Sequence, residues 1–237
     1  MSSDPWLSGL LACSLTQDAE AIRAALHARG LKTRSVPTGR AKGAWTCVTD
    51  RGTLAVVTGG MGPDSARAAA SFWMPRARWL VYACAGPGTG TADPGTTVLD
   101  GPHDLAVLAA RGAPPDATTQ AKVAAVTEPV LGPSARATLA DSGYAAWDPS
   151  VAPWREACQA VGGVTLVCQG ITTTDPERDR DLLQDVKDGA TGRPWWRKAA
   201  AYALPSTRRT QRQADERHKQ AIQQAARCAV AALLGPA

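Results

Sequence analysis

The residues from Leu80 to Gly95 constrain most strongly what this chain can fold into. Apolar, β-prone residues continue to Ala85, and Gly86 then begins a loop of glycine, proline, threonine and other small residues. This break is typical of a buried strand that ends in a loop where another group approaches the backbone closely. We therefore predict that the loop forms the floor of a ligand site. A tight turn between buried elements is the alternative.

Strand and helix patterns alternate along the rest of the sequence, which favours a layered α/β fold. An apolar run at residues 10–15 is followed by an amphipathic helix pattern that ends before Gly30, and residues 45–49 and 54–58 are typical of a hairpin. Further strands are predicted over residues 79–84, 96–99, 122–130 and 164–171, and helices over residues 16–26, 64–73, 133–141, 153–161 and 206–234. Residues 101–119 are rich in proline, glycine and alanine and show no periodic pattern.

The composition excludes several classes of protein. With 237 residues, of which 44% are apolar and 20% charged, the chain can bury a full-sized core, so intrinsic disorder is not expected. No run approaches the roughly 18 apolar residues that span a bilayer, and the N-terminus lacks a signal-peptide pattern, so we expect a cytoplasmic protein. Much of the formal charge of +5 comes from Arg193 and the residues that follow it. Since no nucleic-acid-binding motif accompanies this charge, a nucleic-acid partner is not expected.

Side chains that could hold a metal ion are scattered along the sequence. The six cysteines lie mostly inside apolar runs, without a C-x-x-C pair or a histidine at ligand spacing, so we expect reduced core thiols and no metal site. Of the three histidines, His27 and His218 lie on helix patterns and are expected at the surface. His103 lies in a predicted loop and is the histidine that merits a functional test.

Three short segments resemble, in order and approximate spacing, the signatures of the purine nucleoside phosphorylase and nucleosidase superfamily. They cover residues 58–66 (TGGMGPDSA), 83–88 (ACAGPG) and 93–98 (DPGTTV). Residues 126–130, 135–139 and 144–150 and the pair Asp175-Pro176 extend the likeness along the chain. Within the superfamily, the Asp-Pro pair and the Gly-Arg-Pro at residues 192–194 are most similar to the hopanoid-associated branch.

This resemblance implies a three-layer α/β/α fold with a central mixed β-sheet, of the phosphorylase/hydrolase type. It implies a single domain over residues 1–237, in which residues 193–237 are a basic helical C-terminal extension, and a homo-oligomer. The implied activity is cleavage of the N-glycosidic bond of a purine nucleoside derivative, by hydrolysis or with phosphate as cosubstrate, without any other cofactor. The likeness to the hopanoid-associated branch implies a lipid-linked nucleoside as the small-molecule substrate.

Two acidic residues fall at the catalytic positions of the superfamily, Asp18 as a shorter carboxylate and Asp175 with a one-residue insertion at residues 172–174. Without the insertion, Thr174 occupies the second position. The resemblance assigns Asp175 as the general acid near the purine base and Asp18 as the carboxylate that positions the attacking water. Each residue also has a purely structural interpretation. Asp175 precedes Pro176 and is then the N-cap of the next helix, whereas Asp18 is an acidic residue in the first turn of a helix, where it interacts with the helix dipole.

Five small residues match the sugar side of the superfamily pocket. Gly60, Gly62, Gly86 and Gly88 are implied to bring backbone amides close to a sugar or an anion, as glycine loops at helix starts do. Ser65 is implied to contact phosphate or ribose, and capping of the following helix is its alternative role.

A departure from the family pattern occurs at Asp148 and Ser150, which are implied to lie against the substrate. The ribose-binding glutamate of the family falls on Ser150, so a short neutral side chain replaces a carboxylate that holds two sugar hydroxyls. This replacement favours an alternative function, in which a catalytically impaired family member acts as a ligand-binding or assembly subunit.

Trp195 and Trp196 are surrounded by arginine and lysine residues. Paired aromatic and cationic residues are typical of peripheral contact with an anionic membrane. Packing beneath a helix or in a dimer contact is the alternative.

Overall fold

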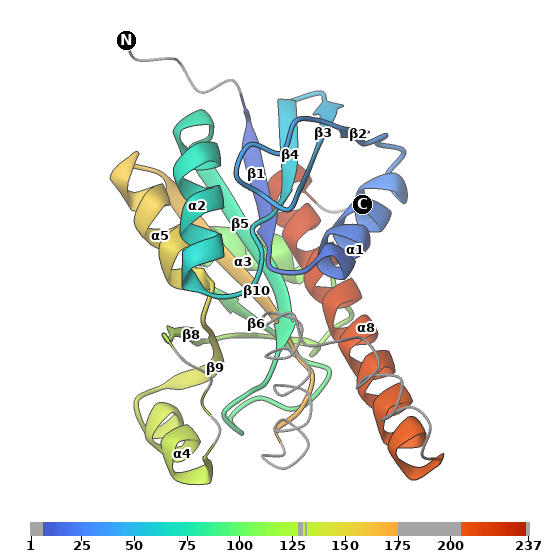
Figure 1. Cartoon of the computed structure of the whole chain (residues 1–237), viewed down its shortest axis with the longest axis vertical. Coiled ribbons are helices and arrows are strands. Elements are labelled where there is room, and N and C mark those ends of the chain that lie inside the picture. Colours follow the sequence, from blue (N-terminus) through green and yellow to red (C-terminus); the bar gives the residue numbers. More distant parts are fainter. Residues whose placement is uncertain (1–6, 128–129, 131, 175–204, 236–237) are drawn as a thin grey trace.

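The computed structural model of the chain describes residues 7–127, 130, 132–174 and 205–235 (Figure 1). An eight-stranded sheet forms its centre, in the order β2-β3-β4-β1-β5-β10-β6-β7. These strands are β1 (Gly9–Cys13), β2 (Arg34–Ser35), β3 (Gly43–Thr49), β4 (Gly52–Thr58), β5 (Trp79–Gly86), β6 (Thr97–Asp100), β7 (Thr118–Gln120) and β10 (Val164–Ile171). A smaller sheet pairs β8 (Lys122–Ala125) with β9 (Tyr144–Asp148).

The middle of the large sheet is parallel, and its flanks are mixed. Strands β4, β1, β5 and β10 run in the same direction, whereas β3 is antiparallel to β4 and β6 is antiparallel to β10. Strands β3 and β4 form the predicted hairpin, with Thr49 opposite Gly52 at the turn. The carboxyl ends of four parallel strands therefore meet at one edge of the sheet.

Helices cover both faces of this sheet (Figure 1). One face packs against α2 (Pro63–Trp73) and α5 (Val151–Ala160), and the other against α1 (Thr16–His27), α3 (His103–Ala110) and α8 (Pro205–Leu234). The short 3-10 helix η1 (Met74–Arg76) follows α2, and α4 (Pro133–Asp141) packs on β9. In β5, Tyr82 and Cys84 pack toward α2 and α5, whereas the alternate residue Ala83 packs toward the other layer. The predicted three-layer α/β/α fold with a central mixed sheet is confirmed.

Some elements differ from the prediction. Helix α3 and the first two residues of strand β7 lie within residues 101–119, where the sequence shows no periodic pattern. Helix α3 has only eight residues and is apolar on most sides, and β7 has only three residues. The strand predicted over residues 122–130 ends at Ala125, which pairs with Asp148, the last residue of its partner β9.

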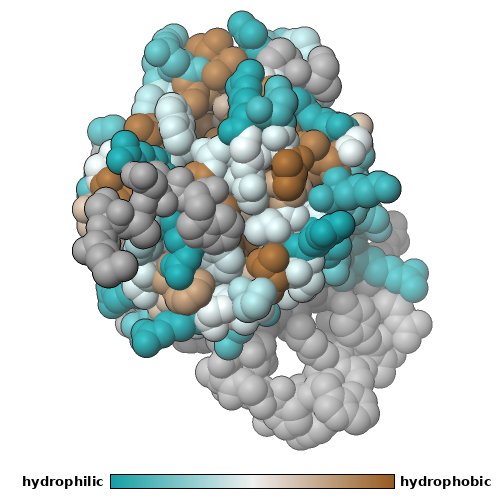
Figure 2. All heavy atoms as spheres, turned by 90° about the horizontal axis from the view of Figure 1, so that it is seen from above, coloured by the Kyte–Doolittle hydropathy of each residue, from teal (hydrophilic) through white to brown (hydrophobic). Residues whose placement is uncertain are grey.

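All six cysteines are free and buried, as predicted. In the view from above, apolar side chains are interspersed with hydrophilic ones (Figure 2). No helix within the described ranges has a stretch long and apolar enough to cross a membrane. Asp175, residues 192–194, Trp195 and Trp196 lie outside the described residues, so their predicted roles stay predictions.

Candidate active site

Loops that follow the parallel strands meet at the carboxyl edge of the sheet. The backbone N–H of Gly59, after β4, donates to the carbonyl of Cys13 at the end of β1 (2.8 Å). The N–H of Gly88, after β5, donates to the carbonyl of Thr173, after β10 (3.0 Å). Open α/β sheets bind ligands outside the carboxyl ends of their strands, so this edge is the candidate active site.

A chain of hydrogen bonds crosses this edge through polar side chains. Ser14 Oγ lies 2.5 Å from the Tyr82 hydroxyl, which donates to Asp148 Oδ1 at 3.3 Å. The backbone N–H of Ser150 donates to the same carboxylate oxygen (2.6 Å), and Ser150 Oγ accepts from the N–H of Gly62 (3.1 Å). The chain connects Ser14 after β1, Tyr82 in β5, the turn at the end of β9 and Gly62 after β4. It therefore holds the predicted residues Asp148, Ser150 and Gly62 in one cluster.

The carboxyl group of Asp148 is easier to protonate than an ordinary aspartate. Burial raises its pKa from 3.8 to about 6, although the hydrogen bonds from Ser150 and Tyr82 lower it, and the charge of Asp18 raises it further. Burial, and after it the charge of Asp148, raises the pKa of Tyr82 and that of Cys84. A carboxyl group whose pKa is raised by burial and by a second carboxylate is typical of sites that separate an acid from a base.

The raised pKa makes Asp148 a source of pH-dependent instability. Below pH ~4 the group is protonated in both the folded and the unfolded chain. As the pH rises through the folded pKa of about 6, ionisation favours the unfolded chain, so stability is lost and stays lost at higher pH. The variant Asp148→Asn keeps an acceptor oxygen but no charge, so we expect it to be stabilised relative to wild type by about 2 kcal/mol more at pH 8 than at pH 4.

Urea unfolding of both proteins at the two pH values measures this difference. The control is Asp64→Asn, because the Asp64 side chain is fully exposed (100%). A stability difference between Asp148→Asn and wild type that does not change with pH would contradict the assigned cause.

Asp18 is the second acidic group at this edge. It is the third residue of α1, its carboxylate is buried (1% exposed), and its Oδ2 accepts a hydrogen bond from the backbone N–H of Leu15 (3.4 Å). Its Oδ1 lies 3.2 Å from Nε2 of His218. Burial raises the pKa of Asp18, whereas the hydrogen bond and charge of His218 and the Leu15 N–H lower it. The bond to Leu15 fits the structural interpretation of Asp18, and the contact with His218 adds a partner from the C-terminal helix.

Two of the predictions for histidines are wrong. His218 was expected at the surface, but its side chain is only 12% exposed because it packs against Asp18. His103 begins α3, where it is exposed and hydrogen-bonded to Gln120 (3.0 Å). It follows β6, whose antiparallel direction carries the chain away from the carboxyl edge of the parallel strands.

The first glycine turn is shaped by its backbone conformation. Gly60 (φ 89°) and Gly62 (φ 82°) have positive φ values that favour glycine, and Gly62 is the N-cap of α2. The capping role considered for Ser65 is not found, because no side chain caps this helix. Ser65 packs against the turn instead: a Cβ added to Gly60 would lie 3.0 Å from the Cβ of Ser65.

The second glycine loop packs closely against the protein itself. A Cβ on Gly86 would lie 2.8 Å from Nε2 of the buried Gln169, and one on Gly88 would lie 3.0 Å from Cγ2 of Ile171. Gln169 Nε2 donates to the carbonyls of Trp147 (3.1 Å) and Pro87 (3.4 Å), so it fastens this loop to β9. Both glycines therefore have a packing role, and their contact with a ligand stays a prediction.

No protein-family model matches the sequence, and no curated protein does. Solved structures do match. The 5'-methylthioadenosine/S-adenosylhomocysteine nucleosidase from Neisseria meningitidis, in complex with methylthio-immucillin-A, has a TM-score of 0.69 at 14% identity, over 96% of this chain and 98% of that one. Futalosine hydrolase of Helicobacter pylori has a TM-score of 0.68 at 11% identity, over 96% and 97%. A 5'-methylthioadenosine/S-adenosylhomocysteine nucleosidase from Colwellia psychrerythraea, in complex with adenine, has a TM-score of 0.68 at 12% identity, over 98% and 97%.

This chain has the fold of these nucleosidases. Within the nucleosidase fold, the structure gathers most of the predicted site residues at one edge of the sheet. They are Asp18, Gly60, Gly62, Ser65, Gly86, Gly88, Asp148 and Ser150. The remaining one, Asp175, follows Thr174, whose carbonyl accepts a hydrogen bond from the guanidinium of the buried Arg136 (3.3 Å).

Three further residues at this edge were not predicted from the sequence. Tyr82 and Gln169 are polar residues within two strands that the sequence predicts to be buried. Because a buried polar side chain needs a hydrogen-bond partner, their positions could have indicated that they join other polar groups. His218 lies on a helical stripe with Ala214 and Ala221, which are both buried. That 3-to-4-residue spacing was visible in the sequence and could have placed the histidine on the buried side of its helix.

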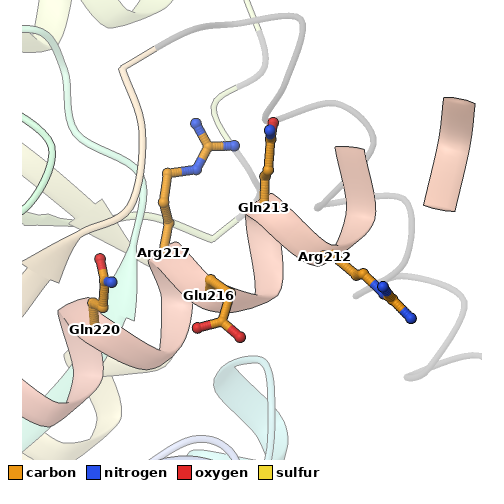
Figure 3. A pocket seen from close by; sticks show the side chains of 5 residues that line it. All are labelled: Arg212, Gln213, Glu216, Arg217 and Gln220. Atoms are coloured by element: carbon orange, nitrogen blue, oxygen red, sulfur yellow. The ribbon is translucent and has the colours of Figure 1, made fainter. Parts of the chain in front are cut away.

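A surface pocket on α8 lies apart from the predicted site residues. It is lined by Arg212, Gln213, Glu216, Arg217 and Gln220 (Figure 3). Among the described residues, no three or more histidine, cysteine, aspartate or glutamate side chains gather in a way that could hold a metal ion.

Proposed function

We propose that this chain hydrolyses the N-glycosidic bond of a purine nucleoside derivative. The observation that supports the proposal is the position of Asp18 and the Asp148–Ser150 turn. At the carboxyl edge of a nucleosidase fold, this turn is hydrogen-bonded to Gly62 of the first glycine turn, and Asp18 interacts electrostatically with Asp148. Breaking this bond requires a proton for the leaving base, stabilisation of a cationic sugar and a nucleophile on the opposite face. Carboxyl groups and water can supply all three, so the proposed reaction needs no cofactor.

The roles follow from the positions of the acidic residues. Asp18 orients the attacking water, because it is a buried carboxylate held by hydrogen bonds from His218 and the backbone of Leu15. Burial raises its pKa, and the hydrogen bond and charge of His218 oppose that rise. Asp175 gives the proton to the leaving base, from the segment that follows β10 and Thr174. The negative charge of the carboxylates at this edge stabilises the developing cation of the sugar.

Two observations favour water over phosphate as the nucleophile. The N–H of Gly62, at the start of α2, is already held by Ser150 Oγ, so it is not available to an anion. The carboxyl groups of Asp18 and Asp148 also make the edge unfavourable for a further negative group, since the charge of Asp18 already raises the pKa of Asp148.

The side chain of Ser150 bears on the class of nucleoside that the site binds. Ser150 is buried and uses its oxygen to accept from Gly62, so it holds sugar hydroxyls less strongly than a carboxylate would. A nucleoside with a large apolar substituent, such as the lipid-linked nucleoside of the hopanoid-associated branch, gains binding energy from that substituent instead. Trp195 and Trp196 then contact a membrane surface, and the chain forms a homo-oligomer.

Release of free base from a panel of nucleosides tests the proposal. The panel contains adenosine, inosine, methylthioadenosine and an adenosyl lipid, each with and without phosphate. We expect at least one to release its base without phosphate, at a rate that phosphate leaves unchanged, and to yield the free sugar. Absence of base release from every substrate would contradict hydrolysis. Formation of a sugar phosphate would show that the reaction is phosphorolysis and not hydrolysis.

The second candidate function is ligand binding without catalysis, and Ser150 is the observation that favours it. Thermal unfolding with the same ligands separates the two. A stabilising ligand that is recovered intact supports the binding subunit, whereas a stabilising ligand that is cleaved supports the enzyme.

A further inference from the structure

Helix α8 brings a histidine to the acidic group that orients the water in the proposed reaction. His218 Nε2 lies 3.2 Å from Asp18 Oδ1, although 200 residues separate them in the sequence. The two side chains are 12% and 1% exposed, so the contact is shielded from water. Nε2 of the Gln17 amide lies 2.8 Å from the same ring nitrogen. Since an amide nitrogen only donates, the Gln17 amide must turn its oxygen toward the ring when His218 Nε2 donates to Asp18. A shielded contact between ionisable groups is stronger than the same contact at the surface, because the dielectric is lower there.

Packing fixes the position of α8, and therefore that of His218. A Cβ on Gly170, in β10, would lie only 2.3 Å from the carbonyl oxygen of Ala221, so α8 touches the sheet at this glycine. A Cβ on Gly112 would similarly lie 2.4 Å from the carbonyl oxygen of Arg227. Ala221 is three residues after His218 and lies on the same side of the helix. The contact that sets the helix against the sheet is thus one turn from the histidine.

We propose that His218 is a positioning residue for Asp18: it holds the carboxylate in one orientation so that it can orient water. This inference rests on the proposed function. The ring donates from Nε2 to Oδ1, while the backbone N–H of Leu15 donates to Oδ2. With both oxygens held, the carboxylate cannot rotate about its last bond, and the water that it contacts keeps a fixed direction.

The groups that surround Asp18 explain why a histidine is needed. Four groups interact with Asp18 electrostatically, and each of them is neutral or negative: Cys13 of β1, Tyr82 and Cys84 of β5, and Asp148 at the end of β9. Of the groups that the described residues bring to Asp18, only His218 can carry a positive charge. Removing the ring therefore leaves a buried carboxylate whose pKa rises further, and its ionised form is lost at a higher pH.

Three variants test the role through the pH dependence of activity. His218→Ala removes the ring, His218→Gln keeps an N–H donor without the charge, and Lys219→Ala changes the exposed neighbour on α8 as the matched control. We expect kcat of His218→Ala to fall about 100-fold with KM nearly unchanged. The acidic limb of its profile should move upward by about one pH unit. His218→Gln should recover part of kcat, and Lys219→Ala should match wild type.

A loss of activity in His218→Ala without any change in the pH profile would overturn the proposal, because it would show a purely structural role. Equal losses in His218→Ala and His218→Gln, with both proteins folded by circular dichroism, would overturn the donor role.

Histidine NMR tests the contact without any substrate. The chain has three histidines, so the ring signals of His27, His103 and His218 can be assigned by substitution. We expect the His218 ring to be the Nε2–H tautomer when neutral, and its signals to move in Asp18→Asn but not in the exposed control Asp64→Asn. Unchanged His218 signals in Asp18→Asn would overturn the pair whatever the activity. Changed signals together with no base release from any nucleoside would instead overturn the proposed function and, with it, the positioning role.

Discussion

Replacing Asp175 by asparagine should slow base release by about 10²-fold to 10⁴-fold, the usual contribution of a general acid. Asparagine has nearly the same shape as aspartate but cannot deliver a proton, so the leaving base must depart as an anion. The effect should fall on kcat, because the proton is needed in the transition state rather than for binding. Single-turnover measurement of free base with the best nucleoside of the panel gives the rate.

The matched control for this prediction is Asp179→Asn. Asp179 is four residues further along the same charged segment and has no assigned role in catalysis. Its variant should release base at the rate of wild type. A rate for Asp175→Asn within a few fold of the control would show that Asp175 is a helix cap and not the acid, the alternative that its position before Pro176 allows.

The arrangement of strands and helices was predictable because local patterns and the layer rules agree. The run at Leu80–Ala85 is apolar on both faces, as a strand with helices on both sides must be. The hairpin at residues 45–58 was predictable from its turn, and the register that places Thr49 opposite Gly52 confirms it. Residues 101–119 were not predictable, because a helix of eight mostly apolar residues has no polar face to reveal its period.

The candidate site was partly predictable for a topological reason. Asp18, Gly60 and Gly86 each follow or end a predicted strand, and parallel strands bring such positions to one edge of the sheet. The partners that tune these groups were not predictable in the same way. Tyr82 and Asp148 belong to different sheets, and their hydrogen bond exists only because the small sheet packs beside the large one.

The ion pair and hydrogen bonds that hold the small sheet beside the large one also join residues far apart in the sequence. Asp100 Oδ2 accepts from the backbone N–H of Val123 (2.7 Å) and from the guanidinium of Arg155 (2.5 Å). Arg155 also donates to the carbonyl of Val123 (3.2 Å), so one ion pair joins β6, β8 and α5. Neither Asp100 nor Arg155 belongs to a sequence motif, so only the fold shows that their side chains form an ion pair.

Substituting alanine for Gly170 should destabilise the fold strongly, because it separates α8 from the sheet. The added Cβ would lie 2.3 Å from the carbonyl oxygen and 2.6 Å from the carbonyl carbon of Ala221. Both are backbone atoms, so the whole helix must move. We expect a loss of about 3 kcal/mol in the free energy of unfolding, at the upper end of the usual cost of overpacking. Urea unfolding of the variant against wild type measures this loss.

Gly132→Ala is the control, because a Cβ there would lie 3.9 Å from the nearest atom, Ser134 Oγ, and the φ of −101° suits alanine. Its stability should stay within about 1 kcal/mol of wild type. Adding Ala221→Gly to Gly170→Ala should not restore stability, because the clash is with backbone atoms and not with the Ala221 side chain. Restoration would contradict this cause. Since His218 lies one turn from Ala221, the helix shift in Gly170→Ala should also change the ring signals of His218. The same single methyl group therefore tests both the packing of α8 and its connection to the active site.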